Sequence, residues 1–245
     1  HNGWWPSFIS ELEKEAFTEG GMPFEEHLRR IAARDYGEAS IGKVVTMWKR
    51  WSDLAKDYVP TDINQYGPFR IGPSYPYTFG HAVADKKSCP IARYACNGLD
   101  ICRFDYLDNK FVQQLQPERQ DVEYIGKEIE LLEPMAAAYA EGEKLFSSIP
   151  GAKAAEMANF SGYLAACTRT GINVKRGAIA FLSQDEKGVL AAAREEYANA
   201  EGAIQYVEKD SRLGWEPTME YCGGPAQIRW KLGLMEKYYG KGNLK

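Results

Sequence analysis

Apolar residues recur at intervals of three and four along five segments of the chain, which is the spacing of an amphipathic helix. The longest segment covers residues 157–181, and its apolar positions include Leu164, Cys167, Val174 and Phe181. The other four segments cover residues 41–58, 122–139, 190–207 and 228–239. A stripe of this kind must be buried, so the pattern predicts five helices that pack against one another.

Short turns separate the three central segments. Pro150-Gly151 lies between the second and the third, and Ser183 with Glu186 forms a capping box that opens the fourth. Links this short favour antiparallel neighbours, so we expect residues 117–210 to form an up-down-up three-helix bundle.

The remaining helical features fit the same fold class, a mainly α, antiparallel helical bundle. Two shorter helices are predicted over residues 7–18 and 23–35, and Pro134 should kink the second long helix because it removes a hydrogen bond. The alternative is an intermolecular coiled coil. Small residues such as Gly171 and Ala193 on the stripes favour close packing inside one domain instead.

Residues 59–116 are the exception, because they are rich in proline and aromatic residues and have no helical period. Flexible linkers are polar or rich in glycine and serine, so this stretch is predicted to be an irregular insertion that lies against another surface. Short strands are possible at 101–106. The expected organisation is residues 1–36 as short helices and 37–245 as the bundle domain, with the irregular insertion at 59–116.

Composition narrows the function classes. The chain has 245 residues, of which 44% are hydrophobic and 26% charged, with a net charge of −4. This is an ordinary globular composition. Lysine and arginine are scattered among acidic residues, which argues against nucleic-acid binding. No run of about 18 apolar residues occurs, so no membrane span is expected.

The five cysteines predict neither a disulfide framework nor a zinc site, because their number is odd and none forms a C-x-x-C pair. Cys167 lies on an apolar stripe and is predicted to be a small buried residue. The composition favours a reducing, cytoplasmic compartment. A single Cys89–Cys96 or Cys96–Cys102 bridge remains an open alternative.

Catalytic and cofactor motifs are missing from the sequence. It contains no G-x-S-x-G, Walker loop, G-x-G-x-x-G or H-E-x-x-H motif. His1, His27 and His81 are too far apart to indicate a metal cluster, and each is predicted to be a surface residue. We therefore expect no metal and no cofactor, and independent catalysis is disfavoured.

Residues 63–79 form the most distinctive part of the insertion, because two Gly-Pro turns stand five residues apart. Prolines fix the backbone, so Tyr66, Arg70 and Tyr75 could be displayed to a sugar at little entropic cost. Flat rings and polar groups together are typical of carbohydrate sites. The alternative, which the residue types favour, is a strap over the bundle with buried aromatic side chains.

The sequence WEPTMEY places Glu216 and Glu220 four residues apart. Glycoside hydrolysis needs two carboxyl groups about 5–10 Å apart, so the pair could act as acid and base. Pro217 occupies a helix-start position, however, which puts Glu216 outside any helix. The favoured alternative is that the two glutamates cap a helix or pair with Arg212 or Arg229.

Four motifs carry a resemblance to a known group of proteins. They are RDYGE (34–38), MWKRWSDLAKDYVP (47–60), QYGPFRIGPSYP (65–76) and DSRLGWEPTMEY (210–221). Together they resemble the C-terminal helical region of large bacterial glycoside hydrolase-like proteins that have an upstream (β/α)₈ barrel. In these proteins HNGWWPS would be similar to the end of the last barrel strand.

The resemblance implies a non-catalytic, bacterial helical domain or subunit. Its partners would be the catalytic barrel and an oligosaccharide, and the catalytic carboxylates would lie on the barrel, where the strands end. No catalytic residue of the family carries over. The implied carbohydrate-binding residues are Trp4 and Trp5 at the barrel mouth, with Tyr66, Arg70, Tyr75, Trp215, Glu216, Glu220 and Tyr221 along a groove.

Two other hypotheses follow from the residues themselves. The first is a structural or protein-interaction bundle with no glycan role, whose insertion 59–116 docks a partner. The second is an autonomous glycosidase that uses Glu216 and Glu220.

Overall fold

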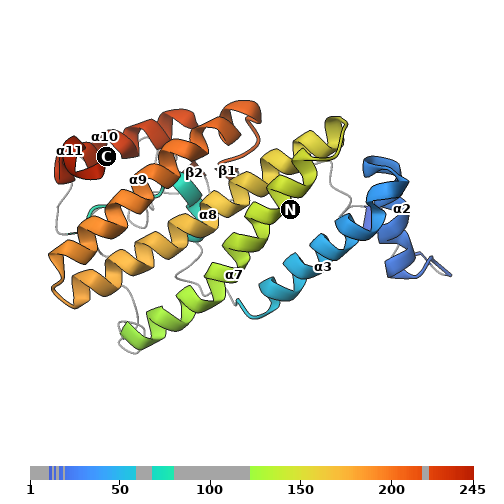
Figure 1. The fold of residues 1–245 in the computed structure, drawn as a ribbon, viewed down its shortest axis with the longest axis horizontal. Helices are drawn as coiled ribbons and strands as arrows, with labels where there is room; N and C mark the ends of the chain where they lie inside the picture. The colour runs from blue at the N-terminus through green and yellow to red at the C-terminus, as the bar shows by residue number, and fades with distance from the viewer. Residues whose placement is uncertain are drawn as a thin grey trace, which may run out of the picture.

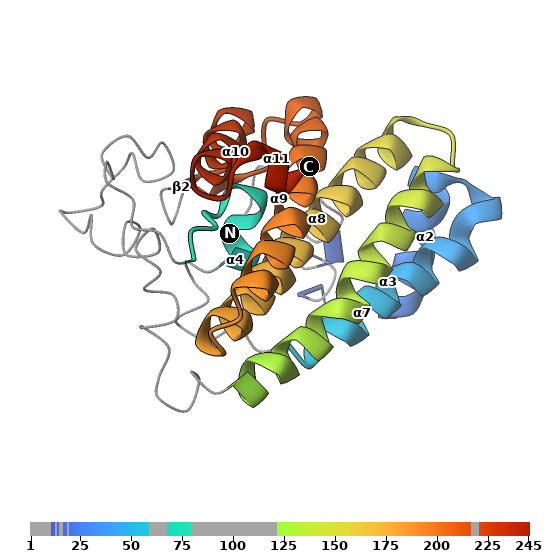
Figure 2. The ribbon, with the colours of Figure 1, turned by 60° about the vertical axis from the view of Figure 1, so that its left-hand side comes forward.

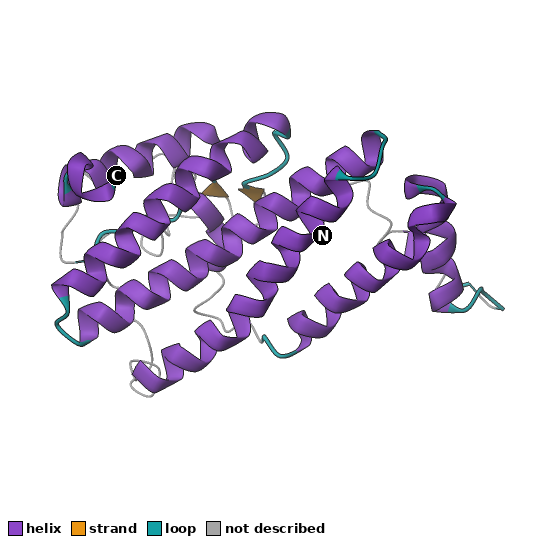
Figure 3. Cartoon of the chain, in the orientation of Figure 1, coloured by secondary structure: helices purple, strands orange, loops and turns teal. Residues whose placement is uncertain are grey.

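The computed structural model describes residues 11–12, 14, 17–18, 20–58, 68–79, 122–216 and 221–245. These residues are mainly helical, as Figures 1 and 3 show, which confirms the predicted helical bundle. The helices are α2 (Phe24–Tyr36), η1 (Glu38–Ser40), α3 (Ile41–Lys56), α4 (Pro68–Ile71), η3 (Gly72–Ser74), α7 (Val122–Ser147), α8 (Ala152–Leu182), α9 (Glu186–Lys209), α10 (Pro225–Tyr239) and α11 (Lys241–Leu244). Two short strands, β1 (Trp215–Glu216) and β2 (Tyr221–Cys222), pair antiparallel.

Helices α7, α8 and α9 lie side by side and alternate in direction, with α8 in the middle (Figure 1). This arrangement confirms the predicted up-down-up bundle. Between residues 161 and 180 of α8, only Arg169 and Arg176 are exposed. A helix enclosed on nearly every side needs small residues to admit its neighbours, and α8 has buried alanines and glycines such as Ala165 and Gly177.

The capping box predicted at Ser183 is wrong by two residues. Helix α9 begins after Asp185, whose carboxylate accepts a hydrogen bond of 3.0 Å from the backbone amide of Gly188. Ser183 instead ends α8, and its amide donates to the carbonyl of Ile179. A carboxylate at a helix N-terminus meets unpaired amides and the positive end of the helix dipole, which explains why aspartate takes this position.

The N-terminal helices follow the predicted pattern where they are described. Helix α2 confirms the segment expected at 23–35, and Glu11, Leu12 and Lys14 are helical within the segment expected at 7–18. Helix α7 continues through Pro134, so the proline does not end it.

A small hydrophobic cluster joins α2 and α3 to the adjoining ends of α7 and α8. The ring of Tyr36 lies 5.7 Å from that of Trp48 and 5.3 Å from that of Phe146. Its buried members are Leu28, Ile31, Ala32, Tyr36, Val44, Val45, Trp48, Phe146, Ala154 and Ala158. Residues of the expected segment 1–36 therefore share one core with residues of the bundle.

A large hydrophobic cluster fills most of the remaining described structure. It contains Tyr58, Leu213, four buried residues of 71–79 (Ile71, Tyr75, Tyr77 and Phe79) and buried apolar residues from each of the helices α7 to α11. Helix α10 packs against α9, and Figure 2 shows α10 and α3 at opposite ends of the helix row. Residues 71–79 of the insertion contribute to this core, although they are distant in sequence from the helices that they meet.

Candidate functional site

Residues 68–79, which we call the strap, cross the face formed by α8, α9 and α10. Tyr75 is 1% exposed, Tyr77 0% and Phe79 4%. This burial agrees with the covering strap, the alternative that the residue types favoured. It also corrects the placement of Tyr75 in a sugar-binding surface, because a ring enclosed by the core offers no face to a ligand.

Hydrogen bonds and close packing hold the strap in place. The hydroxyl of Tyr77 donates to the carbonyl of Val189 at 2.7 Å, and the hydroxyl of Tyr239 donates to the carbonyl of Phe79 at 2.9 Å. Gly177 admits the strap to α8, since an added Cβ would lie 2.8 Å from the ring of Phe79. The strap is therefore part of the folded core.

The corner, which we define as residues 214–216 and 221–223, lies directly against the strap. The amide of Gly223 donates to the carbonyl of Gly214, and β1 and β2 pair Trp215 with Cys222. A Cβ added to Gly223 would lie 2.8 Å from the hydroxyl of Ser74 in η3. The structure thus brings together the two segments in which sequence analysis placed most of the candidate binding residues.

The other predicted site residues are placed only in part. Arg70, Trp215, Glu216 and Tyr221 belong to described backbone in the strap and the corner, while their side chains lie outside the described part. Trp4, Trp5, Tyr66 and Glu220 lie outside the described residues altogether. The cysteines of the two alternative bridges and His81 lie outside them as well.

A buried polar network lies beneath the strap, and sequence analysis did not predict it. Glu196 of α9 and Lys231 of α10 are both 0% exposed and form a salt bridge. The ammonium of Lys231 also donates to the carbonyl of Pro73 at 2.9 Å. Thr170 and Asn173 of α8 donate to the Glu196 carboxylate at 2.8 and 3.0 Å.

The network joins α8, α9, α10 and the strap at one point. A buried charge is tolerated only when it is paired and hydrogen-bonded, and here both charges meet these conditions. Burial lowers the pKa of Lys231, while the charge and hydrogen bond of Glu196 act in the opposite direction. The arrangement positions these helices, and it leaves neither charged group open to solvent.

The signal for this network is present in the sequence. Lys231 stands three residues after Ile228 and four before Met235, and Glu196 stands three after Ala193 and four before Ala200. Each charge therefore interrupts an apolar stripe at a core position. Two charges of opposite sign on core faces indicate a buried pair, although the sequence alone does not show that they meet.

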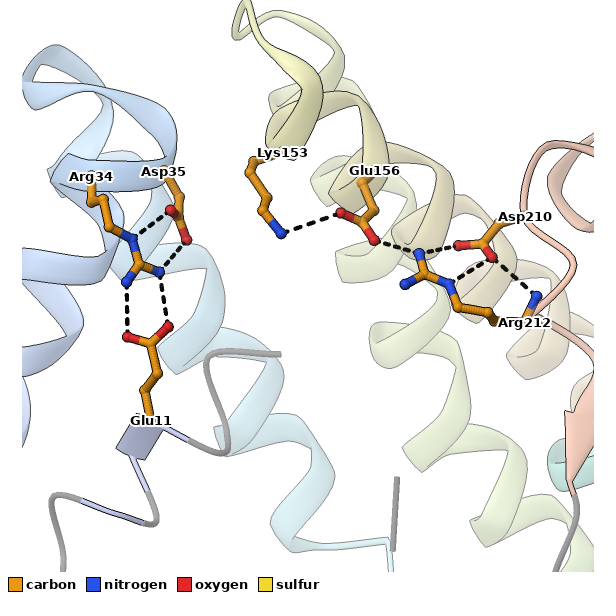
Figure 4. Close-up of polar contacts among 7 residues, drawn as sticks. All are labelled: Glu11, Arg34, Asp35, Lys153, Glu156, Asp210 and Arg212. Carbon is orange, nitrogen blue, oxygen red and sulfur yellow. Dashed lines mark hydrogen bonds and ion pairs between the residues drawn. The ribbon is translucent and has the colours of Figure 1, made fainter. Parts of the chain in front are cut away.

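Ion pairs connect two of the recognised motifs to the helix ends around them (Figure 4). Arg212 pairs with Asp210 at 2.6 Å and with Glu156 of α8, and Lys153 approaches Glu156 at 3.6 Å. The Arg212 side chain holds the pKa of Asp210 below its ordinary value, and burial opposes this shift.

A second ion cluster lies at the end of α2. Arg34 donates to Asp35 at 2.7 Å and to Glu11 at 2.9 and 3.0 Å (Figure 4). Burial raises the pKa of the neighbouring Tyr36, and the charges of Asp35 and Glu156 act in the same direction. The motifs RDYGE and DSR thus lie near the same N-terminal turn of α8.

The sequence offered Arg212 and Arg229 as partners of Glu216 or Glu220. Arg229 forms an ion pair with Glu208.

A pocket of about 530 Å³ opens between α7, α8 and α9, and we call it the outer pocket. Its wall combines charged residues, amides and small apolar side chains. The lining residues are Glu133, Ala136, Ala137, Arg169, Ile172, Asn173, Arg176, Glu195, Ala198 and Asn199.

A second pocket, of about 540 Å³, lies between α2 and α3. Beside it, His27 is 3% exposed, which corrects its prediction as a surface residue. His27 follows the buried face of α2 together with Leu28 and Ile31. Among the described residues, neither ring nitrogen of His27 has a hydrogen-bond partner. The lining residues of this pocket are Leu12, Phe24, Leu28, Trp48, Lys49, Ser52 and Asp53.

Two further expectations concern metals and membranes. The described residues contain no group of three or more histidine, cysteine or acidic side chains that could hold a metal ion. Within the same residues, no helix combines the length and the apolar character that a membrane crossing needs.

Cys167 is a buried free thiol, as predicted, and burial raises its pKa to about 12.

Comparison with known proteins gives this chain no relative. No protein-family model matches it, and no significant match was found among the curated proteins or the solved structures.

Proposed function

We propose that this chain is a non-catalytic helical domain or subunit of a carbohydrate-active, glycoside hydrolase-like protein. It supports substrate binding by a catalytic module and the packing of that module. The observation that carries the proposal is the contact between the strap and the corner, where Gly223 lies against Ser74. Five of the nine candidate binding positions, Arg70, Tyr75, Trp215, Glu216 and Tyr221, belong to the described residues of these two adjoining segments.

Contacts between the recognised motifs support the same proposal. Tyr58 of the second motif packs on Phe69 of the third at a ring distance of 5.3 Å. The third lies beside the end of the fourth, since Ser74 approaches Gly223, which follows Tyr221 by two residues. Sequence segments that are far apart thus meet along one side of the bundle, which is what a shared docking or binding surface requires.

The proposal is tested by isothermal titration of neutral oligosaccharides of four to six sugars. The titration compares this chain, the complete protein with its catalytic module, and the complete protein with Trp215→Ala or Tyr66→Ala. We expect the complete protein to bind a glycan and both variants to weaken binding about tenfold, the effect of one lost aromatic contact. A complete protein that neither binds nor cleaves any glycan would refute the proposal. Turnover by this chain alone, abolished by Glu220→Gln, would replace it with an autonomous glycosidase.

A second candidate function is a protein-interaction bundle without a glycan role. The burial of Tyr75, Tyr77 and Phe79 favours it, because these rings stabilise the fold and offer no platform for sugar stacking. In this case Trp215→Ala and Tyr66→Ala would weaken association with a protein partner, measured by analytical ultracentrifugation, or weaken folding. The glycan affinity of the complete protein would remain unchanged.

A further inference from the structure

Helix α8 has two opposite faces with different surroundings. Cys167 and Gly171 face the strap. A Cβ atom added to Gly72 would lie 2.7 Å from Cys167 Sγ, and one added to Gly171 would lie 3.5 Å from Phe69 Cβ. Arg169 is two residues from both Cys167 and Gly171, so it lies about 200° around the helix axis from each of them. The outer pocket, which Arg169 lines, therefore lies on the side of α8 away from the strap.

The charges around the outer pocket balance. Arg176 pairs with Glu133 at 2.8 Å across α8 and α7. Arg169 and Glu195 also line the pocket, and neither forms a salt bridge with any described residue. Two guanidinium groups and two carboxylates give a lining with no net charge, so an ionic ligand gains no overall attraction.

The floor of the pocket is held in place by the buried network. Asn173 is 5% exposed and donates to Glu196 at 3.0 Å. Asn199 donates to the carbonyl of Ala166 and to the hydroxyl of Thr170, both at 3.0 Å. Side chains fixed by such bonds are preorganised, which lowers the entropy cost of binding a ligand.

We propose that the outer pocket binds one or two units of a neutral saccharide, a proposal that rests on the proposed function. Each sugar hydroxyl both donates and accepts hydrogen bonds, and the lining offers both: arginine donates, glutamate accepts, and asparagine does either. Ala136, Ala137, Ile172 and Ala198 supply apolar contacts for the sugar C–H groups. The volume of about 530 Å³ lies within the range of small-molecule sites. This subsite is separate from the strap and the corner.

Saturation-transfer NMR and isothermal titration on the full 245-residue chain test the proposal. The probes are cellobiose, maltose and N,N′-diacetylchitobiose, with glucuronate and glucosamine as charged comparisons. Ala198→Trp fills the pocket, and we expect it to weaken disaccharide binding at least tenfold. Arg169→Ala removes one charged donor and should weaken binding about tenfold. Ala226→Trp adds the same bulk at an exposed position of α10 outside the pocket, and it should bind like the unaltered chain. Circular dichroism verifies that each variant is folded.

Three outcomes would overturn the saccharide subsite. They are no binding of any disaccharide at millimolar concentration, equal binding by Ala198→Trp and Ala226→Trp, or tighter binding of glucuronate or glucosamine than of the neutral disaccharides. None of them refutes the proposed function, which depends on glycan binding by the complete protein. Conversely, a complete protein without glycan affinity refutes the proposed function, whatever the isolated chain binds.

Discussion

Two buried polar sites of this protein, one beside each hydrophobic cluster, differ in how their polar groups are paired. Beside the large cluster, Glu196 and Lys231 are fully enclosed, and their charged atoms meet each other, the hydroxyl of Thr170 and the carbonyl of Pro73. Beside the small cluster, His27 is 3% exposed, and neither ring nitrogen has a hydrogen-bond partner among the described residues. A satisfied polar network gives directional contacts, whereas an unsatisfied group only costs free energy.

The origin of the two clusters explains the difference. The large cluster joins the strap to helices more than 100 residues away in sequence, as the bond from Lys231 to Pro73 shows. Apolar contacts alone do not specify one register among such distant segments, while a paired charge favours one arrangement. The small cluster is formed largely by the neighbouring helices α2 and α3, which short-range sequence order already brings together.

The largest expected effect comes from breaking the buried pair. Lys231→Met should lower the free energy of unfolding by about 3–5 kcal/mol, because it leaves the Glu196 carboxylate buried without a countercharge. Urea denaturation followed by circular dichroism measures the loss. The double variant Lys231→Met with Glu196→Gln should recover about 2 kcal/mol or more, since the unpaired charge is gone. Equal stability of the single and double variants would contradict the role given to this pair.

A smaller loss is expected where the strap meets α8. Gly177→Ala should destabilise the chain by about 1–3 kcal/mol, because the new methyl group would press on the rings of Tyr77 and Phe79. Gly202→Ala is the matched control, since a Cβ there meets nothing within 4 Å. It should stabilise α9 by about 0.5–1 kcal/mol. Thermal unfolding distinguishes the two, and equal shifts would mean that the strap does not pack tightly on α8.

Replacing the buried polar group beside the small cluster should change the free energy of unfolding in the opposite direction. His27→Leu is expected to raise the free energy of unfolding by about 1 kcal/mol, because it replaces a buried imidazole that has no hydrogen bond to the described residues by an apolar side chain. Urea denaturation at pH 7 provides the measurement. A loss of 1 kcal/mol or more would show that the imidazole has a stabilising partner, and the contrast between the clusters would not hold.

The smallest effect is expected at the partly exposed ion pair of Asp210 and Arg212, and it depends on pH. Asp210→Asn should cost about 0.5 kcal/mol at pH 7. Arg212 holds the pKa of Asp210 below its ordinary value of 3.8, so the native state binds fewer protons than the unfolded state. The contribution is complete above about pH 5 and is lost as the pH falls through the native pKa. Urea denaturation of both proteins from pH 7 to pH 3 should therefore show a converging difference, and a constant difference would contradict this assignment.

Helix positions were predictable because their signals are local. The 3/4 spacing of apolar residues identified the segments that became α3, α7, α8, α9 and α10. Burial of Cys167 followed from its place on a stripe. Local signals failed where several residues competed for one role: Ser183 has the capping-box spacing, but Asp185 caps α9 with its carboxylate.

The candidate sites were less predictable, because they depend on contacts between distant segments. Tyr75 had two possible roles in the sequence, and only the position of the strap against the helices showed that its ring is enclosed. His27 could not be assigned to the core from its spacing alone, because histidine is common both on surfaces and in interiors. The outer pocket has no sequence motif, since its lining comes from three different helices.

The order of apolar and polar residues by itself determined that this protein is a helical bundle, since each stripe must be hidden from water and short turns bring neighbouring helices together. Only the tertiary structure decided which charges meet inside the core, which face of α8 the strap covers and where a pocket remains open. These features arise when side chains from separate helices share one volume, and no local pattern encodes that geometry.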